Sequence, residues 1–183
     1  MNRNLYTQFA LLEGGLAAGA LIIDAFFTSR IPFYLNTNYL AWALPSALPL
    51  FLLMALIYLP VFQTTRKRLV EILKIFAGMS ILELASLCVL AGIGEEFFFR
   101  GFLQARLAGL TDPWMGLVLS SAIFGLLHWI TPVYALFAAA AGFYLGWLFL
   151  FSGNLVLPAV AHGLYDFLAL LFFLRIKAQI SSR

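Results

Sequence analysis

The chain has 183 residues, of which 63% are hydrophobic and 10% charged, and its mean hydropathy is +0.98. Soluble domains carry roughly 45–50% apolar and about 25% charged residues, so the composition excludes an ordinary soluble protein and indicates one compact membrane domain. The net charge of +3 requires no nucleic-acid partner, because the positive residues gather at loops and ends, as membrane topology demands. The single cysteine, Cys88, excludes an intrachain disulfide.

The predicted elements are apolar segments long enough to cross a membrane, which takes roughly 20 residues of helix. Glu13 and Asp24 interrupt the first segment, which we expect to be a retained helix because no small-residue cleavage site follows it. Thr111, Asp112 and Pro113 are typical of a helix start. In chain order the segments are residues 9–27, 40–62, 75–107, 114–130, 133–151 and 155–174. The sequence therefore predicts an all-α, polytopic transmembrane helix bundle with about six crossings.

Basic residues indicate the topology of this bundle, because cytoplasmic loops carry an excess of Lys and Arg. One basic run follows the second segment and another follows the last, so we expect both termini in the cytoplasm. A crossing that began at residue 75 would place Glu95 ~30 Å away, at the far face. Residues 69–83 are therefore expected to form an interfacial or partly inserted helix. The basic residues are Arg66, Lys67, Arg68 and Lys74 in the first run, and Arg175, Lys177 and Arg183 in the second.

A first polar cluster, Glu95-Glu96-Phe97-Phe98-Phe99-Arg100, lies in an otherwise apolar segment. An ionisable group in a bilayer is costly and usually serves a function. Glu96 and Arg100 are one helical turn apart, a spacing that favours an ion pair. Glu95 points about 100° away and is left as an unpaired, partly desolvated carboxylate, which suits a general base. The alternative is that both acids lie in a solvated loop at the end of a span.

The two histidines of the chain stand in two further clusters, each one helical turn from a second residue of interest. Phe124 precedes His128 by four positions, so its ring is expected to wall a pocket beneath the imidazole. His162 precedes Asp166 by four positions, so the carboxylate is expected to hold the imidazole tautomer or to accept a proton. The alternatives are an interfacial His128 in an aromatic belt beside Trp129, and a structural His162–Asp166 pair bonded to a neighbouring helix.

Together the three clusters supply a carboxylate base, two imidazoles, a second acid and an ion pair. These groups suffice for water-mediated amide hydrolysis, which needs a base for water and donors for the oxyanion. They also contain a candidate zinc set, His128 and His162 with Glu95 or Asp166, since three protein ligands plus water make an open catalytic site. The sequence has neither an H-E-x-x-H helix nor a G-x-S-x-G elbow, and nothing near Cys88 supports cysteine chemistry.

The order Glu-Glu-x-x-x-Arg, Phe-x-x-x-His and His-x-x-x-Asp on successive helices resembles the CPBP family. These are the CAAX-prenyl-protease and bacteriocin-processing intramembrane proteases, also called the Abi family. The resemblance covers roughly residues 84–174, and Phe99-Arg100-Gly101 extends the first motif. It implies a catalytic helix bundle of residues 76–183 around a water-filled cavity. Residues 1–75 would form an N-terminal transmembrane helix pair and a basic cytoplasmic loop.

The resemblance also implies roles for the site residues. Glu95 would act on water, with His128, His162 and Asp166 as partners and the Glu96–Arg100 pair as support. Asp166 stands where eukaryotic-type CAAX proteases have Asn, and its extra negative charge slightly favours metal binding or a shared proton. Family members have been described both as metalloproteases and as glutamate-dependent proteases, so the cofactor stays open between zinc and none.

The sequence thus predicts an intramembrane endopeptidase of a prokaryotic plasma (inner) membrane, acting on a membrane-associated peptide or protein. One alternative is a non-catalytic scaffold or assembly subunit of a larger membrane complex, whose buried polar groups serve helix association. A second is a small proton or metal-ion transporter. The inverted repeats and paired broken helices that mark many transporters are absent from the sequence.

Overall fold

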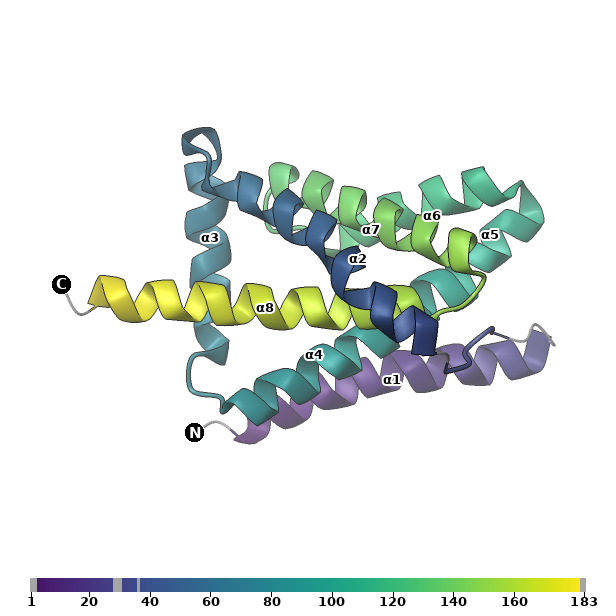
Figure 1. Ribbon diagram of the computed structural model, residues 1–183, viewed down its shortest axis with the longest axis horizontal. Coiled ribbons are helices and arrows are strands. Elements are labelled where there is room, and N and C mark those ends of the chain that lie inside the picture. Colours follow the sequence, from purple (N-terminus) through teal and green to yellow (C-terminus); the bar gives the residue numbers. More distant parts are fainter. Residues whose placement is uncertain (1–2, 28–30, 36, 182–183) are drawn as a thin grey trace.

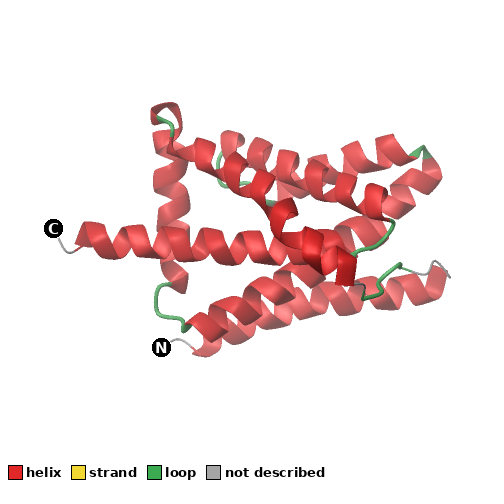
Figure 2. Cartoon of the chain, viewed as in Figure 1, coloured by secondary structure: helices red, strands yellow, loops and turns green. Residues whose placement is uncertain are grey.

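A computed structural model describes residues 3–27, 31–35 and 37–181 of the chain (Figure 1). Every regular element in these ranges is a helix, as Figure 2 shows. The longest helices run roughly along one direction, and one shorter helix crosses the end of the bundle at a steep angle (Figure 1). The architecture confirms the expected all-α, polytopic helix bundle.

Four helices of the described ranges are long and apolar enough to cross a membrane. They are α1 (Arg3–Phe27), α2 (Thr37–Ala55), α7 (Pro132–Ser152) and α8 (Val156–Ser181). Helix α2 continues through Pro45 and Pro49, as membrane helices do when neighbouring groups satisfy the freed carbonyls. Four such helices in a chain with 63% hydrophobic residues identify an integral membrane protein.

The sequence predicts about six crossings, and the described ranges hold four long apolar helices and one bent helix pair. Residues 81–110 form one helical run, made of α4 (Ile81–Glu96), a π-helical stretch, η4 (Phe97–Gln104), and α5 (Ala105–Leu110). This run is bent by 115° from the preceding segment, Pro60–Phe76, and the pair together makes at most a fifth span. The fourth expected crossing, residues 114–130, corresponds to α6 (Pro113–Leu127), which has 15 residues. At 1.5 Å per residue it is ~22 Å long, shorter than a hydrocarbon core of about 30 Å.

Residues 69–83, expected to form one interfacial or partly inserted helix, are divided in the structure. Their first part belongs to α3 (Gln63–Leu73) and the short turn η3 (Lys74–Phe76), and their last part belongs to α4. The boundary is set by Ser80, whose side chain accepts a hydrogen bond from the Glu83 backbone while the Glu83 carboxylate accepts one from the Ser80 backbone. This capping box starts α4 at Ile81, so residues 81–83 belong to α4 and not to α3.

Glycines allow the close helix contacts that position the site. A Cβ at Gly92 of α4 would overlap the backbone of Ala159 and Gly163 on α8, and one at Gly163 would overlap the Cys88 carbonyl. A Cβ at Gly94 would likewise overlap the Glu13 carbonyl of α1. Small residues let backbones approach in membrane bundles. Helix α4 is therefore held between α1 and α8, as Figure 1 shows, just before the residues of the first polar cluster.

Candidate active site

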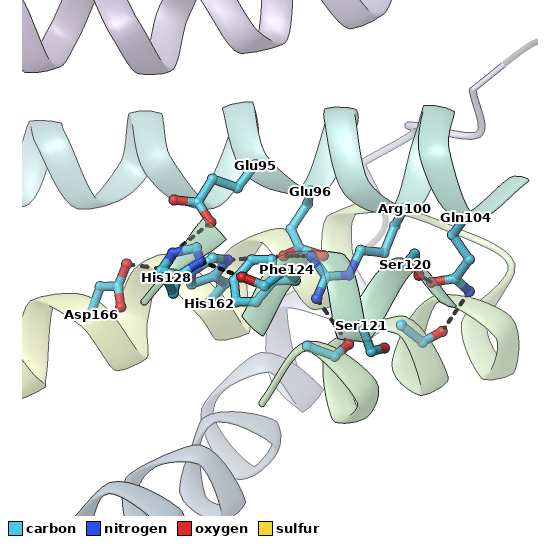
Figure 3. Close-up of polar contacts among 12 residues, drawn as sticks. Glu95, Glu96, Arg100, Gln104, Ser120, Ser121, Phe124, His128, His162 and Asp166 are labelled. Atoms are coloured by element: carbon cyan, nitrogen blue, oxygen red, sulfur yellow. Dashed lines mark hydrogen bonds and ion pairs between the residues drawn. The ribbon is translucent and has the colours of Figure 1, made fainter. Parts of the chain in front are cut away.

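The structure brings together the polar side chains that the sequence placed on three different helices (Figure 3). Glu95 Oε2 lies 3.6 Å from His128 Nε2, between the last turn of α4 and the end of α6. On α8, His162 Nε2 lies 3.4 Å from Asp166 Oδ2. Residues of the three motifs therefore lie close together in space, as their order on separate helices predicts.

Glu96 is the bridge between two of these groups. Its Oε1 atom lies 3.1 Å from Nη1 of Arg100 and 2.9 Å from Nδ1 of His162. The first contact is the ion pair expected from the sequence, and the second joins α4 to α8. Glu96 and Arg100 are 0% and 1% exposed. An ionised carboxylate can accept hydrogen bonds but cannot donate them. The contact with Glu96 therefore places a proton on Nδ1 of His162.

Arg100 is enclosed by aromatic and backbone groups. Its Nη2 donates to the Gly142 carbonyl of α7 at 2.9 Å, and its guanidinium carbon lies 4.8 Å from the centre of the Phe124 ring. Arg100 lies in the π-helical stretch, which begins directly after Glu96. Such stretches are rare and are frequent at functional sites. The side chain thereby neutralises a buried carboxylate and links three helices.

His128 is oriented by the residue one turn before it. Its Nδ1 donates to the Phe124 carbonyl at 2.8 Å, and its ring stacks on the Phe124 ring at a centroid distance of 4.2 Å. Nε2 is therefore the nitrogen that faces Glu95. The edge of the Phe124 ring also packs against His162, with centroids 6.1 Å apart. These contacts place His128 within the cluster, which an interfacial aromatic belt does not account for.

The sequence did not single out Gln104, which extends the polar interactions along the helix. Its Nε2 donates to the Gly146 carbonyl at 3.2 Å, and Ser120 Oγ lies 3.5 Å from its Oε1. Arg100 and Gln104 thus bind carbonyls one turn apart on α7. The signal that could have found Gln104 was its spacing of four from Arg100, both polar in an apolar segment.

Glu13 is a second residue that the sequence interpretation missed. It lies on α1, where the helix crosses α4 beside Gly94, and it lines the same cavity as Glu95. Its Oε2 atom is buried and makes no hydrogen bond to any residue of the described ranges. In the sequence, Glu13 was regarded only as a polar residue that interrupts the first apolar segment. The rule that intramembrane acids are costly and functional applies to it as well and was the signal that could have found it.

A cavity of about 540 Å³ adjoins these groups. Five titratable side chains of the site face it, and the rest of its lining is almost entirely apolar, drawn from helices along most of the chain. Pockets of this kind bury an apolar ligand and orient it through a few polar groups. The carboxylate and imidazole residues that line it are Glu13, Glu95, His128, His162 and Asp166.

The histidines of the candidate zinc set are each held through Nδ1, His162 by Glu96 and His128 by the Phe124 carbonyl. Their Nε2 atoms face Asp166 and Glu95, and Nε2 is the atom that would bind a metal. In the part of the chain that the structure describes, no three His, Cys, Asp or Glu side chains are arranged to hold one metal ion.

Comparison with known proteins places these residues in a family. The family described as Rce1-like, type II CAAX prenyl endopeptidase, matches residues 77–168, a range that contains all six predicted site residues. The uncharacterized protein YpbD of Bacillus subtilis (strain 168) is 35% identical over 96 residues, which are 51% of this chain and 47% of YpbD. The chain thus spans about half the length of this curated relative. No solved structure matches the chain significantly. Because the family match covers half of the chain and all three motifs, the chain belongs to the Rce1-like family of type II CAAX prenyl endopeptidases.

Proposed function

We propose that the chain is an intramembrane endopeptidase in which Glu95 activates water. The observation that carries this proposal is the position of Glu95: its Oε2 atom is buried, makes no hydrogen bond in the described ranges, and lies 3.6 Å from His128 Nε2 at the cavity. Glu96, next to it, is engaged through Oε1 by both Arg100 and His162. Its Oε2 makes no hydrogen bond in the described ranges either, but Glu96 is not among the residues that line the cavity. Of the two neighbouring acids, only Glu95 is placed to accept a proton from a water in the cavity.

The reaction follows from the groups around that water. Glu95 takes one proton as the water oxygen bonds to the scissile carbonyl carbon, and the carbonyl oxygen gains the negative charge. His128, with its Nδ1 proton held by the Phe124 carbonyl, presents Nε2 to the cavity and donates from it to this oxyanion when protonated. Glu95 then returns its proton to the leaving amine as the carbon–nitrogen bond breaks, which yields a carboxylic acid and an amine.

His162 and Asp166 support this chemistry from α8. Glu96 holds the Nδ1 proton of His162, so Nε2 points toward Asp166 and the cavity. The buried Glu96–Arg100 pair fixes the orientation of that imidazole. We infer that His162, when both of its ring nitrogens are protonated, is the second oxyanion donor through Nε2, and that Asp166 keeps its ring in place or shares the Nε2 proton.

The cavity lining indicates the class of substrate. Apolar side chains surround the polar groups, and several of the helices that carry them are long and apolar enough to cross a membrane. A membrane-associated peptide or protein fits this environment, and the family description adds a CAAX-type, prenylated C-terminus as the first candidate. The enzyme would then lie in the lipid bilayer of a prokaryotic plasma (inner) membrane, with both termini in the cytoplasm.

Comparison of peptide termini in membranes tests the proposal while the substrate is still unidentified. Cells that express the wild-type chain or Glu95→Gln at equal levels are compared by mass spectrometry of new protein termini. We expect termini that are present with the wild type and absent with Glu95→Gln. Glu71→Gln, which removes an exposed acid of α3, is the matched control and should retain them. Identical termini for wild type and Glu95→Gln would favour the scaffold alternative.

A further inference from the structure

Helix α3 has two chemically different faces. Thr65 and Leu69 are buried against the bundle, whereas Lys67, Glu71 and Lys74 are exposed on the opposite side. A helix with one apolar face and a basic polar face is typical of segments that lie in the plane of a membrane interface. The local sequence alone therefore favours an in-plane orientation for α3.

The position of α3 in the fold agrees with this orientation. It crosses the end of the bundle at a steep angle in Figure 1, and its segment is bent by 115° from the helical run that starts at Ile81. The start of α1 and the end of α8 lie at the same end of the bundle (Figure 1). With the long helices along the membrane normal, α3 is therefore nearly parallel to the membrane surface.

Two contacts hold α3 on the bundle. The Thr65 hydroxyl lies 2.9 Å from that of Thr131, a buried pair between α3 and the start of α7. Arg66 Nη1 donates to the Tyr58 carbonyl at 3.1 Å, and its guanidinium lies over the Tyr58 ring. Arg66 is thus used inside the protein, and the remaining cations of α3 face away from it.

The remaining cations lack sufficient counter-charge in the described protein. Lys74 pairs with Glu71, while Lys67 and Arg68 are exposed and make no ion pair with another described residue. Clusters of Lys and Arg at a membrane surface attract anionic lipids. We infer that the outer face of α3, formed by Lys67, Arg68 and Lys74, binds the phosphate headgroups of anionic phospholipids in the adjacent leaflet.

This lipid contact would act on the cavity, because α3 also forms part of the cavity wall. Leu69, Ile72 and Leu73 line the same cavity as Glu95 and the two histidines. Headgroups bound to the outer face would hold these apolar side chains over the polar groups. This consequence rests on the proposed proteolysis: it predicts faster cleavage in anionic membranes, whereas the lipid binding itself does not require any activity.

Lipid titration of the purified full chain tests the inference. The wild type is reconstituted in phosphatidylcholine nanodiscs that contain increasing fractions of phosphatidylglycerol, and bound phosphatidylglycerol is counted by native mass spectrometry. The double variant K67Q/R68Q should bind phosphatidylglycerol more weakly, by roughly fivefold for each cation removed, because a Lys or Arg at an anionic surface contributes about 1 kcal/mol to binding. The charge-preserving variant K67R/R68K should bind like the wild type, and raised salt should weaken wild-type binding.

Two results would overturn the inference. One is equal phosphatidylglycerol binding by wild type and K67Q/R68Q, and the other is binding that does not respond to salt. Both side chains are exposed, so melting temperatures equal to the wild type should show that K67Q/R68Q is folded. Normal lipid binding without any cleavage would contradict the proposed function alone, and cleavage without lipid selectivity would contradict this inference alone. If K67Q/R68Q lost an acidic protein partner while its lipid binding stayed unchanged, the outer face of α3 would be a binding site for that partner and not for lipid.

Discussion

Glu96 and His162 meet across the contact between α4 and α8, with 2.9 Å between Glu96 Oε1 and His162 Nδ1. The contact joins the first and third polar motifs, which are 66 residues apart in the chain. It depends on the close approach of the two backbones at Gly92 and Gly163. The chemistry of the site is thus tied to the packing of two apolar helices, and this relationship leads to the first prediction.

Gly163→Ala should weaken both the fold and the site. The added Cβ would overlap the Cys88 carbonyl, so α4 and α8 must separate and the Glu96–His162 bond must lengthen. Thermal unfolding in detergent and cleavage by the same preparation measure the two effects. Gly109→Ala is the matched control, because a Cβ there meets no atom within 4 Å and Ala favours a helix over Gly by about 1 kcal/mol. Equal melting temperatures for wild type and Gly163→Ala would contradict the tight contact.

Arg100→Ala should destabilise the fold strongly. It leaves Glu96, which is 0% exposed, as a buried carboxylate without its cation, and breaking a buried pair in this way costs about 3–5 kcal/mol. A large fall in melting temperature is expected, with loss of cleavage. Arg68→Ala serves as the control for the melting temperature, since Arg68 is exposed on α3. A wild-type melting temperature for Arg100→Ala would show that the ion pair has no structural role.

The two histidines should respond differently to replacement. His162 is 6% exposed and bonded to Glu96, whereas His128 is 31% exposed and contacts Glu95 without a hydrogen bond. We therefore expect His162→Ala to lose activity and stability together, and His128→Ala to lose activity with a melting temperature close to the wild type. The difference in melting temperature between the two variants is the measurement. A fully active His128→Ala protein would remove His128 from the proposed oxyanion site.

Glu13→Leu should raise stability while reducing cleavage. An unsatisfied buried polar group costs about 1–3 kcal/mol, and Glu13 Oε2 is such a group within the described ranges. Leucine removes that cost, but it also removes a carboxylate from the cavity that holds Glu95. Gln8→Leu, at an exposed position of the same helix, controls for added apolar surface. A lower melting temperature for Glu13→Leu would mean that Glu13 has a partner in the folded protein.

The sequence predicted which polar residues lie close together better than it predicted the contacts between them. Spacings of four identified Glu96–Arg100, Phe124–His128 and His162–Asp166, because residues one helical turn apart contact each other whatever the rest of the fold does. The order of the motifs on separate helices then indicated a shared location. The structure shows this convergence through the Glu95–His128 approach and the Glu96–His162 bond.

The remaining features depend on contacts that no local pattern encodes. The second partner of Glu96 follows from the register of α4 against α8, and the presence of Glu13 in the cavity follows from the crossing of α1 at Gly94. The π-helical stretch after Glu96 has no marker in a run of phenylalanines. The expected segment of residues 69–83 runs past the true helix start at Ile81, because hydropathy continues unbroken from residue 75 and the capping box at Ser80 decides where the helix begins.

The proposed role of Glu95 as the base is decided by the cleavage rate of Glu95→Gln. The purified variant and the wild type are compared, in metal-depleted buffer and with added zinc, on a substrate identified from the membrane termini. Glutamine keeps the shape of the side chain and removes the base, so we expect a loss of about 10²–10⁴-fold with an unchanged melting temperature. Full wild-type activity without metal would show that Glu95 activates the water without a metal ion. Zinc that binds the wild type stoichiometrically and is lost in the histidine variants would show that a metal ion takes part as well. Undiminished cleavage by the Glu95→Gln protein would contradict the role of Glu95 in either form.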